Sequence, residues 1–202
     1  MDINNSAPFE IIGAPYELYR APLGTPFPKV DEVPAAPWAR IGTSGNLNQN
    51  ADGVKVQMSQ SFNKFRGGGD TGTRKIFRTE EDLIVSVSLA DLSVEALSNA
   101  LNDNTIETVA AGNTAGTKAI GLSRGTFVAT MALLVRGASP YMEDGIAQYE
   151  IPYAAQTGNS DTAYKNGDAA LLGLEFSALI DPTAPVAERY GRYVAQTDHA
   201  NS

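Results

Sequence analysis

Apolar residues recur at every second position in several segments of this chain, and this pattern constrains its fold more than any other feature. In the segment 83–89 (LIVSVSL), the odd positions are all apolar and two of the even positions are serine. The segment 54–65 alternates in the same way, with Val54, Val56, Met58 and Phe62 opposite polar residues. Because successive side chains of a strand point to opposite faces, both segments are predicted to be half-buried β-strands.

Five further segments have strand character. They are 9–20, which Pro15 interrupts, 38–42, 127–135, 148–156 around Pro152, and 172–180. Every second residue from Phe127 to Val135 and from Leu172 to Ile180 is apolar. The chain has 19 Gly and 11 Pro and is only 19 % charged, which is typical of short strands joined by many turns.

The sequence also predicts one helix. Ser93 is placed to cap it, Glu95 suits the positive end of the helix dipole, and apolar residues follow at helical spacing until 102–104 (NDN) ends it. A helix this short is stable only when its apolar side packs against something, here a sheet. The predicted fold is mainly β: an antiparallel β-sandwich or small barrel with one flanking α-helix.

We expect a single domain over residues 1–202, with a core at about 9–181. Three segments are predicted to extend from it: a proline-rich arm at 21–37, a long loop at 65–82 and a C-terminal arm at 182–202. Within the last, 188–196 is predicted to be either a short helix or extended. The strands on either side of the loop are predicted to pair as a hairpin with a glycine-rich tip. A long loop in a compact domain is usually functional or disordered.

The net charge is −8, which disfavours sequence-independent binding to nucleic-acid phosphates. Basic residues nevertheless concentrate in 64–78, and acidic residues concentrate in 143–181. These segments are either solvated surface or surfaces that meet on neighbouring copies. The start of the chain (MDINN) lacks the features of a secretory signal, and no stretch approaches the ~20 apolar residues of a membrane-spanning helix, so no membrane association is expected.

The chain contains few residues that are suited to catalysis. The chain has no Cys and one His, His199, close to the C-terminus, which leaves no cysteine nucleophile and disfavours a zinc site or a Ser–His–Asp arrangement. The segment 67–75 (GGGDTGTRK) lacks the Gly-Lys-Ser/Thr of a phosphate-binding loop. Glu80 and Asp82 would share a strand face, so a carboxylate hydrolase is an alternative, although no aromatic sugar platform lies near them in the sequence. We expect no enzyme activity and no catalytic, cofactor-binding or metal-binding residues.

Ten segments, read in order, carry a resemblance to a known family. They are 13–19 (GAPYELY), 42–45 (GTSG) after Trp38, 65–67 (FRG), 69–72 (GDTG), 77–82 (FRTEED), 90–93 (ADLS), 121–125 (GLSRG), 134–140 (LVRGASP), 148–152 (QYEIP) and 190–196 (YGRYVAQ). Together they resemble the tail tube proteins of long-tailed, non-contractile phages and related prophages. The likeness lies in overall order across nearly the whole chain and not in one diagnostic motif.

The resemblance implies a structural virion protein that forms rings, hexameric in this family, which stack into the hollow tube that delivers DNA. It implies a ring-stacking loop, which on this chain comprises Lys64, Arg66, Gly67, Gly68, Gly69, Asp70, Arg74, Lys75, Arg78, Glu80, Glu81 and Asp82. Acidic residues facing the bore would repel DNA phosphates, and the candidates are Asp161, Asp168 and Glu175.

The implied partners are further copies of the chain and other tail proteins, namely the tape measure, tail terminator and distal tail proteins. DNA would pass through the bore without specific binding, and no cofactor is expected. The expected location is the phage tail, after assembly in the host bacterial cytoplasm. The alternative is a β-rich virion-decorating or adhesin-like binding domain.

Overall fold

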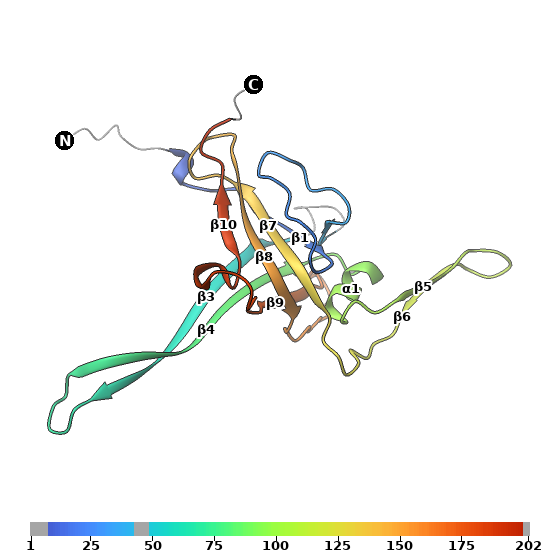
Figure 1. The fold of residues 1–202 in the computed structure, drawn as a ribbon. Helices are drawn as coiled ribbons and strands as arrows, with labels where there is room; N and C mark the ends of the chain where they lie inside the picture. Colours follow the sequence, from blue (N-terminus) through green and yellow to red (C-terminus); the bar gives the residue numbers. More distant parts are fainter. Residues whose placement is uncertain (1–7, 43–48, 200–202) are drawn as a thin grey trace.

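The structure is a computed structural model that describes residues 8–42 and 49–199. The ends of the predicted domain (1–7 and 200–202) and the GTSG segment beyond Gly42 lie outside the described residues. The strands and the helix are β1 (Glu17–Ala21), β2 (Ala39–Arg40), β3 (Gln49–Arg66), β4 (Thr73–Leu89), α1 (Val94–Ala100), β5 (Ile106–Val109), β6 (Thr117–Ile120), β7 (Thr130–Ala138), β8 (Ile146–Gln156), β9 (Leu172–Ala178) and β10 (Arg192–Ala195). The predicted fold class, mainly β and antiparallel with one flanking helix, is confirmed (Figure 1).

An eight-stranded sheet in the order β2-β1-β7-β8-β9-β4-β3 forms the body, and β10 joins it along β8. β8 shares its pairing between two neighbours, because residues 147–150 pair with β10 and residues 154–156 pair with β9. Pro152, which has no N–H to donate, lies between the two pairings. The register between β8 and β7 also shifts there, as at a β-bulge. One edge of β8 therefore pairs with β10 before Pro152 and with β9 after it, while the other edge pairs with β7.

One hydrophobic core joins the two parts of the sheet. Leu18 and Leu133 from β1 and β7 lie in the same cluster as Val85, Leu174 and Phe176 from β4 and β9, and all five are at most 2 % exposed. These residues occupy alternate positions of their strands, as the period-two pattern predicts. Full burial of such a side chain stabilises a fold by about 1.5–3 kcal/mol.

The outer face of β7 is also buried, because the proline-rich segment packs over it. Ala132 and Leu134 form a second cluster with Trp38, against which Phe27 packs with a ring-centroid distance of 5.2 Å. The indole N–H of Trp38 donates a 3.0 Å hydrogen bond to the carbonyl of Pro26. The predicted arm at 21–37 is thus anchored on its own sheet at this point.

Helix α1 begins and ends as predicted. The Ser93 side chain accepts a hydrogen bond from the N–H of Ala96, and Ala96 and Ala100 pack into the core. Asn102 and Asp103 follow in the left-handed region, with φ of 61° and 59°, where the helix cannot continue. Beyond the helix, β5 and β6 form a separate two-stranded hairpin (Figure 1).

Several predicted boundaries are wrong. The strand predicted for 9–20 begins only at Glu17, residues 8–10 form a short 3-10 helix, and Pro15 precedes the first paired residue. Phe127, which is 87 % exposed, and Ile180 lie outside β7 and β9. In both cases the alternation of apolar residues continues beyond the last residue that has a partner strand.

Two of the predicted extensions contain strands that pair with the sheet. The loop predicted for 65–82 is mostly strand, because the ladder between β3 and β4 continues to the pair Arg66–Thr73. The C-terminal arm predicted from residue 182 contains a 3-10 helix at 186–188 and then β10, which pairs with β8. The predicted choice between helix and extended chain for 188–196 is therefore resolved in favour of a strand at 192–195.

Candidate interaction surface

The outer part of the β3–β4 hairpin, residues 59–82, is a two-stranded ribbon that leaves the body of the molecule (Figure 1). Strand β4 pairs with β9 only over residues 84–89, whereas its pairing with β3 extends as far as residue 73. The tip is residues 67–72, where Gly69 adopts a φ of 79° that favours glycine. An isolated two-stranded hairpin is marginally stable in water, and within the described residues no third strand pairs with this part of the ribbon.

Both faces of the ribbon carry large apolar side chains. Cross-strand pairing and alternation place Phe65, Lys75 and Phe77 on one face. They place Phe62, Ile76 and Arg78 on the other face. The four apolar residues Phe62, Phe65, Ile76 and Phe77 are each at least 43 % exposed. A ribbon with apolar groups on both faces needs cover on both faces to remove them from water.

Basic side chains accompany these apolar groups. The ammonium of Lys75 lies 5.0 Å from the ring centre of Phe77, and the guanidinium of Arg78 lies 6.0 Å from that of Phe62. Arg74 pairs with Asp70 at 3.5 Å and Arg78 with Glu81 at 3.3 Å. All of these groups are exposed, so such pairs contribute at most about 1 kcal/mol each. Their charge remains available to a partner.

All twelve predicted loop residues lie on or at the ribbon, and all but Gly67 are exposed. The basic ones cluster toward the tip, whereas Glu80, Glu81 and Asp82 lie at the end nearer the body. Glu80 and Asp82 do share one strand face, opposite Ser61 and Ser59. The ribbon thus has a basic outer end and an acidic inner end.

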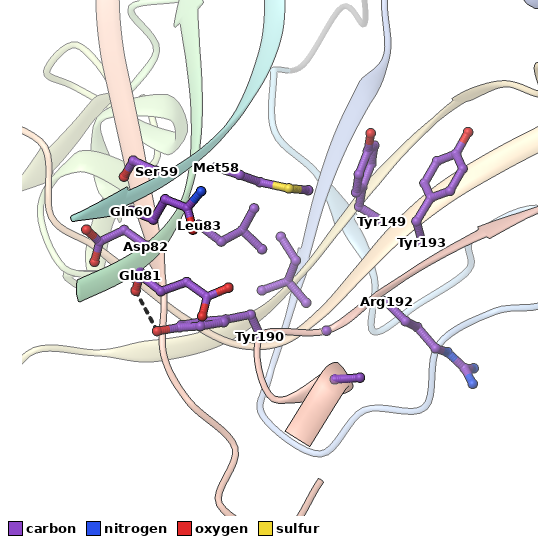
Figure 2. A pocket seen from close by; sticks show the side chains of 13 residues that line it. Met58, Ser59, Gln60, Glu81, Asp82, Leu83, Tyr149, Tyr190, Arg192 and Tyr193 are labelled. Atoms are coloured by element: carbon purple, nitrogen blue, oxygen red, sulfur yellow. Dashed lines mark hydrogen bonds between the residues drawn. The ribbon is translucent and has the colours of Figure 1, made fainter. Parts of the chain in front are cut away.

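A cavity of about 370 Å³ lies where the ribbon joins the body, between the β3–β4 hairpin, β8 and β10 (Figure 2). Its apolar lining includes Met58, Leu83, Ile151, Tyr149 and Tyr193. The last two rings are in contact, with centroids 4.7 Å apart. Met58 is 72 % exposed although it follows Val54 and Val56 along the core-facing side of β3. We call this cavity the base pocket.

The base pocket is bounded by polar groups on two sides. Glu81, on the strand face of Leu83, is its acidic rim group, and the hydroxyl of Tyr190 donates a 2.6 Å hydrogen bond to the carbonyl of Glu81 (Figure 2). Asp82 also borders the pocket, but its side chain lies on the opposite strand face. The basic residue of the lining, Arg192, donates from Nε to the buried carboxylate of Glu150 at 2.6 Å. This hydrogen bond raises the pKa of Arg192. The charge of Arg192 is therefore balanced within the chain.

The three predicted bore residues lie on the opposite side of the sheet from the core or in a connecting loop. Glu175 projects from the outer face of β9, where Ser86 is its partner on β4. Asp161 and Asp168 belong to the connection between β8 and β9, and all three are exposed. The chain at 157–158 packs along this edge, since the N–H groups of Thr157 and Gly158 both donate to the carbonyl of Glu175.

The sequence predictions included the basic ribbon residues but not Ile76, Phe77 or the tyrosines of the base pocket. The sequence does contain a pattern that indicates exposed apolar residues at Ile76 and Phe77. In segments 62–65 and 76–77, apolar residues occupy both odd and even positions, so neither strand face is fully polar. The tyrosines have no such signal, because Tyr149 and Tyr193 come from strands that only the fold brings together.

Comparison of the chain with protein-family models finds no match, and comparison with curated protein sequences finds none either. Within residues 8–42 and 49–199, no three side chains of His, Asp or Glu are grouped so as to hold a metal ion. The helix of the described chain is too short to cross a membrane.

Proposed function

We propose that this chain is the structural subunit of a phage tail tube, whose copies close into rings that stack into a hollow cylinder for DNA delivery. The observation that carries the proposal is the ribbon at residues 59–82, which leaves the body and exposes apolar side chains on both faces. Such an element suits insertion between neighbouring subunits, because only contacts on both sides would cover it.

Ring stacking requires a contact that repeats without closing, and a ribbon that reaches from one copy to the next supplies one. A head-to-tail interface of this kind extends into a filament, whereas a second interface closes each ring. Many copies of a modest contact then hold the tube together through multivalency. The basic outer end of the ribbon adds electrostatic attraction to acidic surface on the next ring.

Passage of DNA through the tube fits the charge of the chain. With a net charge of −8, the protein repels phosphates overall, so DNA would slide without specific binding. Asp161, Asp168 and Glu175 are exposed and available to line the bore. In this function the chain assembles in the bacterial cytoplasm with the tape measure, tail terminator and distal tail proteins, and resides in the virion tail.

Negative-stain electron microscopy of the purified protein, concentrated alone and together with tail-initiating proteins, tests the proposal. Rings or hollow tubes of uniform width are the expected result. Persistent monomers under every condition would contradict the tube function and would favour a virion-decorating or adhesin-like binding domain.

A shortened-ribbon variant tests which element is responsible. Replacing residues 62–79 by Asn-Gly leaves the paired residues Ser61 and Glu80 on either side of a two-residue turn. The matched control replaces residues 110–116 by Asn-Gly in the β5–β6 hairpin, between the paired residues Val109 and Thr117. Both variants should fold, as judged by circular dichroism, because neither removes a core residue. Only the ribbon variant should fail to form tubes; tubes of normal stability from it would exclude the ribbon as the stacking element.

A further inference from the structure

We infer that the base pocket is the receptor for the ribbon tip of a second copy of this chain, with Phe65 as the inserted side chain. This inference rests on the proposed tube function and specifies the acceptor side of the stacking contact. It names a surface between β3–β4, β8 and β10 that neither the sequence pattern nor the resemblance assigns.

The first argument is the unfilled apolar surface of the pocket. Met58 and Leu83 are cross-strand partners on the core-facing side of the hairpin. Leu83 is buried, but Met58 is exposed because the facing strands do not extend over it. A cavity of about 370 Å³ with Met58, Leu83, Ile151 and two tyrosine rings in its wall has room for an aromatic side chain. Burial of an aromatic side chain removes about 150–250 Å² from water.

The second argument is charge complementarity. Glu81, on the same strand face as Leu83, lies at the rim of the pocket, and Arg192 in the lining is neutralised by Glu150 at 2.6 Å. At the ribbon tip, Phe65 is paired directly across the strands with Lys75. Directly opposed residues have Cβ atoms about 4.5–5.5 Å apart, so a lysine accompanies the aromatic ring into the acidic rim. The tip therefore presents an apolar group and a cation to a pocket that offers an apolar wall and the carboxylate of Glu81.

The third argument is that a single chain cannot make this contact with itself. The pocket lies at the inner end of the ribbon and Phe65 at its outer end, and the ladder is continuous between Ser59–Asp82 and Phe65–Lys75 apart from one shift in register. At ~3.3 Å per residue these ends lie roughly 20 Å apart along the strand. The tip of each copy must reach the pocket of another copy, which leaves that copy's own tip free for the next. The contact is head-to-tail and propagates.

Disulfide cross-linking tests the assignment directly, because the chain contains no cysteine. Met58→Cys and Phe65→Cys are made in separate proteins, mixed, assembled and oxidised. The matched control mixes Phe65→Cys with Val33→Cys, since Val33 is 84 % exposed but lies on the proline-rich segment away from the pocket. A covalent dimer from the Met58 mixture, and not from the Val33 mixture, is the expected result.

The outcomes separate this inference from the function on which it rests. If the unsubstituted protein forms tubes but the Met58 mixture yields no more dimer than the control, the base pocket is not the receptor and the tube function stands. If the unsubstituted protein forms neither rings nor tubes, the tube function fails and the receptor assignment fails with it.

A charge exchange provides a second measurement that does not depend on cysteine geometry. Lys75→Glu and Glu81→Lys should each raise the protein concentration needed for assembly by roughly tenfold. Combining both substitutions in one chain restores opposite charges on tip and rim, so assembly should recover most of that loss. Two penalties that simply add in the combined variant would show that Lys75 and Glu81 do not meet.

Discussion

The hydroxyl of Tyr190 donates a 2.6 Å hydrogen bond to the backbone carbonyl of Glu81, residues 109 positions apart in the chain. This bond ties the segment before β10 to the ribbon where the ribbon leaves the body. Since β10 is itself paired with β8, the bond fixes the base of the ribbon to the C-terminal part of the sheet.

Replacement of Tyr190 by Phe removes this hydrogen bond and preserves the ring. We expect the free energy of unfolding to fall by about 0.5–1.5 kcal/mol, and amide hydrogen exchange in residues 59–82 to become faster. Tyr164→Phe, at an exposed tyrosine of the β8–β9 connection, serves as the control. Unchanged exchange in the ribbon of the Tyr190 variant would show that the bond does not hold the ribbon base.

Neutralisation of the basic ribbon residues should weaken ring stacking without unfolding the subunit. The substitutions replace Lys64, Arg66, Arg74, Lys75 and Arg78 by glutamine, and all five side chains are exposed. Assembly, followed by sedimentation over a range of salt concentrations, should need more protein and should lose most of its salt dependence. If the variant assembles with the same salt dependence as the parent, electrostatic docking of the ribbon is wrong.

Gly137 on β7 is predicted to be intolerant of even one methyl group. A Cβ atom there would lie 2.1 Å from Cδ1 of the Tyr16 ring, whereas a Cβ at Gly173 on β9 would meet no atom within 4 Å. Gly137→Ala should destabilise the fold by about 1–3 kcal/mol. Gly173→Ala, the matched control, should be neutral or stabilising by up to about 1 kcal/mol. Urea denaturation of both variants distinguishes these outcomes, and equal stabilities would contradict the close packing of Tyr16 on Gly137.

A buried polar cluster holds the proline-rich segment on the sheet. Gln148, which is fully buried, donates to the carbonyl of Pro28 and to the carboxylate of Glu150, each at 2.7 Å. Arg136 donates to the carbonyl of Val30 at 2.8 Å, and burial lowers the pKa of its guanidinium. These bonds reach backbone carbonyls, so they depend on the position of the segment more than on its side chains.

Gln148→Leu leaves the Pro28 carbonyl and one Glu150 oxygen without this donor. We expect a loss of about 1–3 kcal/mol in the free energy of unfolding and faster proteolysis within residues 22–37. Gln57→Leu, at an exposed position of β3, provides the control. Unaltered proteolysis in the Gln148 variant would show that the segment is held by the Phe27–Trp38 packing alone.

Alkaline pH should destabilise the fold through Tyr19. Burial, together with a hydrogen bond to Glu17, raises the pKa of Tyr19 to about 12. Its pKa in the unfolded chain is near 10, so the folded state holds the proton more tightly. The contribution of Tyr19 is complete below about pH 10 and is lost as pH rises through about 12.

The urea midpoint should therefore fall between about pH 10 and 12, and Tyr19→Phe should make this decline shallower. It should not abolish the decline, because burial also raises the pKa of Tyr16 and of Tyr149. The same slope in the parent and the variant would mean that Tyr19 ionises equally in both states.

Local patterns predict several elements correctly. Helix α1 follows from the Ser93 cap and helical spacing, and most of β7 and β9 follows from their alternation. The hairpin of β3 and β4 is also predicted, including its glycine-rich basic tip. The errors at Phe9 and Phe127 arise where the pattern continues but no partner strand is present. The length of a strand depends on its neighbours as well as on its own residues.

The sequence by itself determined which segments become strands or a helix, because period-two alternation and capping act between residues close in the chain. It also determined that the ribbon is basic and apolar. Only the tertiary structure decided the order of strands, the cover over the outer face of β7 and the presence of the base pocket. The bonds that create these features join residues about one hundred positions apart, such as Arg136 with Val30 and Tyr190 with Glu81. No local pattern specifies a partner at that separation, because the partner is chosen by the packing of the whole sheet.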